Sequence, residues 1–256
     1  MENNQQNQRQ SLIGIQELFK RSFELYKNNF WTFIVISLLP IAASMILPVL
    51  SLLTGFGLPI LNLLRNPSSP IEFIGVLTSS LLASVPIFLL VGLIIIGVNV
   101  WGAIALIYAI KNNEAGVKES FLQTKDRVLS AIWVGLLVGI ALFFGYLLFF
   151  IPGIIFSIWF SFSFYVLIYE GLHGTKALSR SKQLVDGHWW DVFARLAIIG
   201  VVFFFLNLII QGAPLLSPIL GLLSSSFGPV YSYVIYSDIK GIKDLKKQRE
   251  PPEDKK

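Results

Sequence analysis

Charged side chains are absent from four long stretches of the sequence. These stretches cover residues 28–64, 73–110, 128–169 and 196–237. Each is longer than the ~20 apolar residues that one membrane-spanning helix needs. Apolar stretches of this length indicate an integral membrane protein, and their Pro and Gly residues indicate where each one turns.

The last two stretches each predict a helical hairpin. An Ile-Pro-Gly sequence at 151–153 lies near the middle of 128–169 and predicts a tight turn between two helices of about 20 residues. A Gly-Ala-Pro sequence at 212–214 predicts the turn in 196–237, with a return limb that is irregular up to Gly-Pro at 228–229.

The first two stretches predict a looser hairpin. We expect one helix near residues 30–54, another near 85–110, and short helices at the far membrane surface between them, over 55–84. The sequence therefore predicts an all-α polytopic membrane protein with six transmembrane helices arranged as three hairpins.

The basic residues predict the orientation. With six spans both termini lie on one side, and nineteen of the 20 Lys and Arg residues fall there, leaving Arg65 alone on the other. Basic loops stay in the cytoplasm. We therefore expect a multi-pass protein of the bacterial cytoplasmic (inner) membrane with cytoplasmic N- and C-termini.

Composition agrees with a membrane location. Charged residues make up 14% of the chain and the mean hydropathy is +0.69, whereas soluble domains carry roughly 25% charged residues. The sequence has no cysteine, which removes disulfides and thiolate sites. We expect residues 1–10 to be a disordered polar tail, 11–240 a single membrane domain and 241–256 a charged cytoplasmic tail.

Each hairpin follows an amphipathic stretch, and the three stretches resemble one another. A shift of 102 residues pairs Ser22 with Thr124 and Trp31 with Trp133, and a shift of 159 pairs Ser22 with Ser181. These matches predict three repeats, at about 11–110, 115–170 and 174–237, each with an amphipathic helix lying in the headgroup plane before its hairpin.

A family resemblance is carried by residues 151–190. This segment contains Ile-Pro-Gly at 151–153, Glu-Gly at 170–171, Ala-Leu-x-x-Ser at 177–181 and Trp-Trp at 189–190. It resembles the membrane domain that is attached to some bacterial glycerophosphodiester phosphodiesterases, and a related group of stand-alone, uncharacterised inner-membrane proteins. The resemblance implies a six-helix polytopic fold. In the enzyme members catalysis belongs to a separate soluble barrel domain that this sequence does not contain, so the activity is not implied.

Two pairs of neighbouring residues are candidates for a lipid-headgroup site: Arg21 with Ser22, and Arg180 with Ser181. A guanidinium offers several donors to a phosphate and a hydroxyl adds another. An ordinary solvated basic face is the alternative, since the middle repeat has Gln123 in place of arginine.

Other polar residues suggest structural roles. Glu170 ends an apolar span and could pair with Lys176 or Arg180, be exposed among headgroups, or handle a proton. Hydrogen bonds between helices would account for the intramembrane amides of Asn99, Asn207 and Gln211, and lining of a pathway is the alternative.

The sequence predicts no metal site, no cofactor and no catalytic residue. His173 and His188 lack the further ligands that a metal needs. We expect a non-catalytic, lipid-associated scaffold or accessory protein that contacts anionic headgroups at the cytoplasmic face and does not bind nucleic acid. An unidentified protein partner is compatible with this expectation. A lipid or small-molecule conduit is the alternative, and an intramembrane enzyme is the least favoured class.

Overall fold

The computed structural model describes residues 12–53, 70–210 and 216–249, together with the single positions 57, 61 and 65. These residues form helices and no strand. The helices are α2 (Ile15–Asn28), α3 (Phe30–Ser44), α4 (Ile46–Leu52), α6 (Pro70–Lys111), α7 (Val117–Thr124), α8 (Val128–Leu148), α9 (Phe150–Trp159), α10 (Ser163–Glu170), α11 (Thr175–Val185), α12 (Trp189–Ile210) and α13 (Ser217–Arg249).

Six helical stretches of the described residues are long and apolar enough to cross a membrane. The prediction of an all-α, multi-pass membrane protein is thereby confirmed. The stretches are Phe30–Leu50, Ile74–Lys111, Val117–Leu148, Phe150–Glu170, Trp189–Ile210 and Ser217–Gln248.

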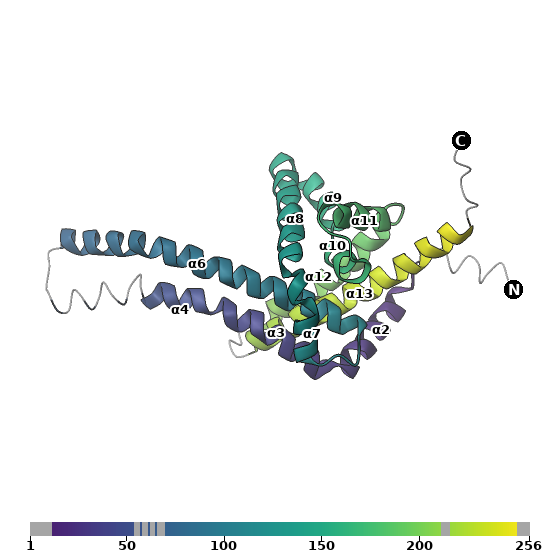
Figure 1. Cartoon of the computed structure of the whole chain (residues 1–256), viewed down its shortest axis with the longest axis horizontal. Coiled ribbons are helices and arrows are strands. Elements are labelled where there is room, and N and C mark those ends of the chain that lie inside the picture. Colours follow the sequence, from purple (N-terminus) through teal and green to yellow (C-terminus); the bar gives the residue numbers. More distant parts are fainter. Residues whose placement is uncertain are drawn as a thin grey trace.

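The helices meet in a region that we call the head. It comprises α2, α7, α10 and α11 together with the parts of α6, α8, α12 and α13 that pack on them (Figure 1). Outside the head, α3 and α4 run beside α6, and α8 packs against α9. The α3–α6 pair and the α8–α9 pair leave the head in different directions (Figure 1).

The hydrophobic core lies in the head. Side chains from distant parts of the sequence are fully buried there, among them Leu18, Phe162, Leu184 and Tyr231. A second cluster joins α2 and α3 to α6 around Phe33. The N-terminal helix is thus held in the same core as the C-terminal helix.

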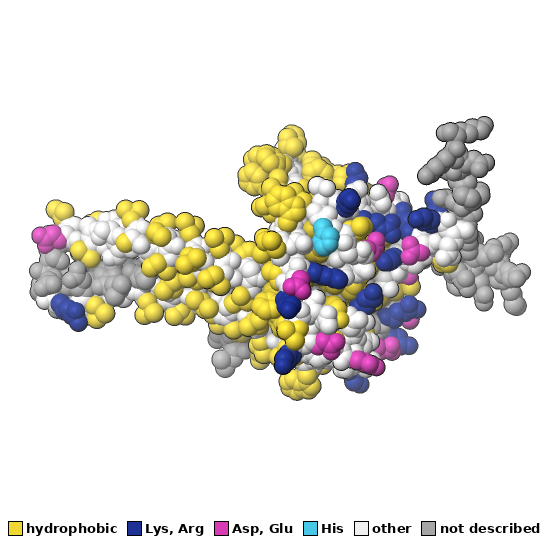
Figure 2. Space-filling view, in the orientation of Figure 1, with side chains coloured by type: hydrophobic (Ala, Val, Ile, Leu, Met, Phe, Trp, Pro, Cys, Tyr) yellow, Lys and Arg dark blue, Asp and Glu magenta, His cyan; other side chains and the backbone are white. Residues whose placement is uncertain are grey.

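Burial falls away from the head. In the stretch Ile74–Lys111, 6% of the most apolar segment is buried inside the protein. In Phe150–Glu170, 44% of the corresponding segment is buried. Figure 2 shows apolar side chains covering the projecting helices, while charged side chains gather over the head. Exposed apolar surface of this extent is typical of helices that face lipid.

The structure corrects the expected helices at the far surface. Helix α6 runs without a break from Pro70 to Lys111, so residues 70–84 continue the second span instead of forming short separate helices. Pro70 starts the helix, where its missing N–H is not needed. The remainder of the expected segment lies largely outside the described residues.

The turn of the second hairpin also lies earlier than predicted. Phe149 has extended backbone angles between α8 and α9, whereas Pro152 and Gly153 belong to the first turn of α9. A Pro in the first turn of a helix loses no hydrogen bond. A Cβ on Gly145 would lie 3.1 Å from Cα of Gly153, so these glycines let α8 and α9 approach closely.

Helix α13 is more continuous than predicted. It runs from Ser217 through Pro229 to Arg249, so the expected irregular limb up to 229 is wrong. A Pro inside a membrane helix is tolerated where neighbouring groups satisfy the backbone. The carbonyl of Pro229 itself accepts a hydrogen bond from the Tyr165 hydroxyl at 2.8 Å, which joins α10 to α13 at this point. The expected boundary at residue 240 falls inside this helix.

The contact of α3 with α6 gives a test of the first hairpin. A Cβ on Gly102 would overlap the ring of Pro40, whereas a Cβ on Gly97, five residues earlier in α6, would meet nothing within 4 Å. Gly102→Leu should therefore destabilise the protein by about 1–3 kcal/mol through overpacking. Thermal unfolding in detergent measures the effect, with Gly97→Leu as the matched control. Equal melting temperatures for the two variants would contradict the packing of α3 on α6.

Candidate functional site

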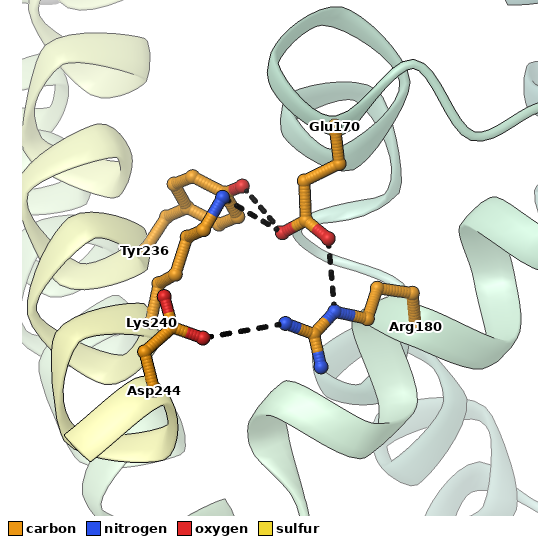
Figure 3. Close-up of polar contacts among 5 residues, drawn as sticks. All are labelled: Glu170, Arg180, Tyr236, Lys240 and Asp244. Atoms are coloured by element: carbon orange, nitrogen blue, oxygen red, sulfur yellow. Dashed lines mark hydrogen bonds and ion pairs between the residues drawn. The ribbon is translucent and has the colours of Figure 1, made fainter. Parts of the chain in front are cut away.

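The carboxylate of Glu170 lies at the centre of a group of charged and polar side chains in the head (Figure 3). Its Oε2 accepts a hydrogen bond from Nε of Arg180 at 2.9 Å. Its Oε1 accepts a hydrogen bond from the Tyr236 hydroxyl at 2.9 Å and lies 3.3 Å from Nζ of Lys240. Asp244 Oδ1 lies 3.9 Å from Nη2 of Arg180. One carboxylate therefore joins α10, α11 and α13.

Local backbone features place Glu170 at this position. Helix α10 ends at Glu170 because Gly171 takes the left-handed conformation, with φ of 68°, which is the usual way for a glycine to stop a helix. Gly174 also has a positive φ, 56°, and directly precedes α11. Arg127 donates a hydrogen bond at 2.6 Å to the carbonyl of Ile168, near the C-terminus of α10. A cation is favourable at that end of a helix.

The Glu170 carboxylate is largely buried, so its stability as a charged group depends on these contacts. The side chain of Glu170 is 14% exposed, and the aromatic rings of Tyr165, Tyr169 and Tyr236 pack against one another beside it. A carboxylate with so little water around it needs partners to remain charged. Both of its oxygens have such partners, so the arrangement is that of a structural ion pair.

Sequence reasoning missed three members of this group. Tyr236, Lys240 and Asp244 recur every four residues and therefore share one face of α13. That spacing was a signal in the sequence, but it did not say which helix the face would meet. Lys176, the other expected partner of Glu170, is exposed on the first turn of α11. No ion pair joins it to Glu170 among the described residues.

The structure separates Arg21 from Ser22. Arg21 is exposed on α2, and its Nε donates to Glu17 Oε1 at 2.8 Å. This hydrogen bond from Arg21 lowers the pKa of Glu17 below its ordinary value. The hydroxyl of Ser22 points the other way, is fully buried and donates to the carbonyl of Leu18 at 2.7 Å. The two side chains do not form a common phosphate site.

Ser181 has a structural role beside the charged group. The helical path from α9 to α10 is interrupted after Trp159, and α10 begins at Ser163. The Ser181 hydroxyl is buried at this break, donates to the carbonyl of Trp159 at 2.7 Å and accepts from the N–H of Phe162 at 3.2 Å. The Ser181 hydroxyl therefore satisfies one backbone carbonyl and one backbone N–H that are left unpaired where the helix is interrupted.

A second polar contact fixes the N-terminal segment. The N–H of Ile13 donates to Asp238 Oδ2 at 2.8 Å, and the carbonyl of Ile13 accepts from Arg195 Nη2 at 2.8 Å. Arg195 is largely buried and also donates to the carbonyl of Asp191 at 3.0 Å. The segment before α2 is thus tied to both α12 and α13.

The intramembrane amides differ from one another. Asn99 of α6 donates to the hydroxyl of Ser44 in α3 at 3.2 Å, and to its own helix at Ile95. Asn207 donates to the carbonyl of Phe203 in its own helix at 2.9 Å. Gln211 lies outside the described residues. Of the two described amides, Asn99 connects neighbouring helices.

The two histidines lie in different surroundings. Within the described part of the chain, no group of three or more His, Asp or Glu side chains is arranged to hold a metal ion. His173 is exposed, and Nδ1 of His188 is buried without a hydrogen-bond partner. We assign no ligand to either.

The Glu170 group gives a second test. Glu170→Gln keeps the size of the side chain but removes the charge that holds Arg180 and Lys240 together, so it should destabilise the protein by about 2 kcal/mol. Lys176→Gln is the matched control and should leave stability unchanged. Thermal unfolding in detergent measures both. A Glu170→Gln protein as stable as the control would contradict the structural ion pair.

Comparisons with protein-family models, with curated proteins and with solved structures match nothing to this chain.

Proposed function

We propose that this chain is a non-catalytic integral membrane protein that associates with lipid and serves as a scaffold or accessory component of the bacterial cytoplasmic membrane. One observation carries the proposal. Tryptophans in the first two turns of α3, α8 and α12 are exposed: Trp31 by 75%, Trp133 by 54% and Trp190 by 74%. Tryptophan favours the boundary between hydrocarbon and headgroups.

A repeated amphipathic helix supports this assignment. Helices α2, α7 and α11 each begin directly after a glycine, at Ile15, Val117 and Thr175. The hydroxyl residues that the sequence aligns, Ser22, Thr124 and Ser181, are all fully buried. Each helix therefore buries the face that carries its hydroxyl residue. In each case this residue lies nine positions before an exposed tryptophan. We propose that the three helices lie in the headgroup plane and that each leads into a hairpin.

Charge supports a cytoplasmic head. The charged side chains gather over the head (Figure 2), and basic residues near spans are retained in the cytoplasm. Several lysines of α7, the following turn and α11 are exposed, including Lys118, Lys125 and Lys176. Such lysines attract an anionic leaflet by ~1 kcal/mol each. Anionic headgroups are therefore the lipids that the head should collect.

The polar groups of the described residues favour a scaffold over a conduit or an enzyme. Asn99 is engaged with Ser44, and Asn207 with its own helix. The Glu170 carboxylate is surrounded by partners. The resemblance of residues 151–190 to a non-catalytic membrane domain points the same way.

The orientation can be tested with single cysteines because the sequence has none. In Arg65→Cys the thiol should react with a membrane-impermeant maleimide in intact spheroplasts. In Lys118→Cys, it should react only after the membrane is permeabilised. Labelling of Lys118→Cys in intact spheroplasts would contradict a cytoplasmic head.

Lipid preference can be tested in nanodiscs of equal phosphatidylglycerol and phosphatidylcholine. Native mass spectrometry of the released protein should show mainly phosphatidylglycerol retained. Replacing Lys118, Lys125 and Lys176 together by Gln should lower this enrichment at least tenfold, since each charge contributes ~1 kcal/mol and ~1.4 kcal/mol corresponds to a tenfold change. Arg65→Gln, on the opposite side, is the control. Equal retention of the two lipids by the unmodified protein would contradict the proposed association.

A further inference from the structure

A groove of about 1060 Å³ runs between α2 and α13 at the head. Residues 12–14 close one part of it, and two helical faces form its sides. Its volume lies just above the roughly 300–1,000 Å³ of small-molecule pockets, so it has room for a large ligand. The residues that line it are Leu12, Ile13, Gly14, Glu17, Arg21, Leu25, Tyr233, Val234, Ser237, Asp238, Gly241, Ile242 and Leu245.

The lining has an apolar part and a charged part. Leu25, Val234, Ile242 and Leu245 provide apolar surface along both helices. The charged part holds one cation, Arg21, and two carboxylates, Glu17 and Asp238. A ligand that matches this groove has an apolar body and carries charges of both signs.

Arg21 is placed to receive an anionic group. Its Nε donates to Glu17, and its two terminal nitrogens make no hydrogen bond to another described residue. Both side chains of this pair are about half exposed, and exposed pairs within one helix are weak. A phosphate diester could therefore bind the terminal nitrogens through two parallel hydrogen bonds without removing a strong contact.

The carboxylates are placed to receive an ammonium group. Asp238 Oδ2 accepts the N–H of Ile13 at 2.8 Å, which fixes the carboxylate against the N-terminal segment and leaves Oδ1 for a second donor. Glu17 belongs to α2, on the opposite side of the groove from Asp238. It lies four residues before Arg21 and therefore shares a helix face with it. Two carboxylates in the lining disfavour a ligand that carries negative charge alone.

We infer that this groove binds one molecule of a phospholipid with a primary-amine headgroup, of the phosphatidylethanolamine type. Its phosphate binds Arg21, its ammonium group binds Asp238 and Glu17, and its acyl chains follow Leu25 and Val234 toward Tyr233. The position fits a lipid, because the apolar part of α13 gives way to charged residues at Asp238. The inference rests on the proposed function, since it requires the head to lie at the membrane surface.

Gly241 offers a way to fill the groove without disturbing the fold. A Cβ at Gly241 meets nothing within 4 Å, and the same holds at Gly221 of α13, which does not line the groove. Leucine is also a better helix former than glycine at both positions. Gly241→Leu should therefore occlude the groove, while Gly221→Leu serves as the matched control.

The test uses the full chain in nanodiscs of equal phosphatidylethanolamine, phosphatidylcholine and phosphatidylglycerol, followed by native mass spectrometry. The unmodified protein and Gly221→Leu should each retain one phosphatidylethanolamine in preference to phosphatidylcholine, whose trimethylated nitrogen has no hydrogen to donate. Gly241→Leu should lower this retention about tenfold. Retention by Gly241→Leu at the control level would overturn the proposal, and so would a groove occupied by a co-purifying protein in place of the lipid.

A second variant separates headgroup recognition from shape. Arg21→Gln should also lower phosphatidylethanolamine retention about tenfold, while Lys20→Gln, an exposed neighbour outside the lining, should not. Equal retention by the two variants would overturn the assignment of Arg21 to the phosphate. Phosphatidylglycerol enrichment in the same spectra reports on the lysine surface of the head. If the groove proposal is wrong and the proposed function is right, phosphatidylglycerol enrichment should remain unchanged in every groove variant.

Discussion

The carboxylate of Glu170 is the point at which three helices of the head are held together. It receives a hydrogen bond from Arg180 of α11 and another from Tyr236 of α13, and it lies beside Lys240. Because it is nearly buried, it needs these partners to remain charged. The same helix, α11, also carries Ser181, whose hydroxyl lies at the break before α10.

The head and the projecting helices are stabilised in different ways. In the head, buried side chains from α2, α10, α11, α12 and α13 share one core. The outer parts of α6 and α12 have few protein neighbours, and their backbone hydrogen bonds are internal to each helix, as a lipid environment requires. Where projecting helices do touch, small residues such as Gly102 and Gly145 allow the close approach.

The proposals rest on three surface features. Exposed tryptophans lie in the first two turns of α3, α8 and α12, lysines of α7 and α11 are exposed, and a groove lies between α2 and α13. Arg21 belongs to the groove, whereas Arg180 belongs to the ion pair with Glu170. Two arginines that the predicted sequence repeat places at equivalent positions thus make different contacts, because only one of them faces a buried carboxylate.

The sequence by itself determined the membrane-spanning character, because a helix needs ~20 apolar residues to cross a bilayer and only local composition enters that requirement. It also singled out Glu170 and Arg180 as possible partners, since both lie in one short segment. It did not determine that Lys240 would be the second cation in place of Lys176, that α13 would continue through Pro229, or that the hydroxyls of Ser22 and Ser181 would be buried. These depend on which helix faces meet. Contacts such as that of Ile13 with Asp238 join residues 225 positions apart, and only the tertiary structure brings them together.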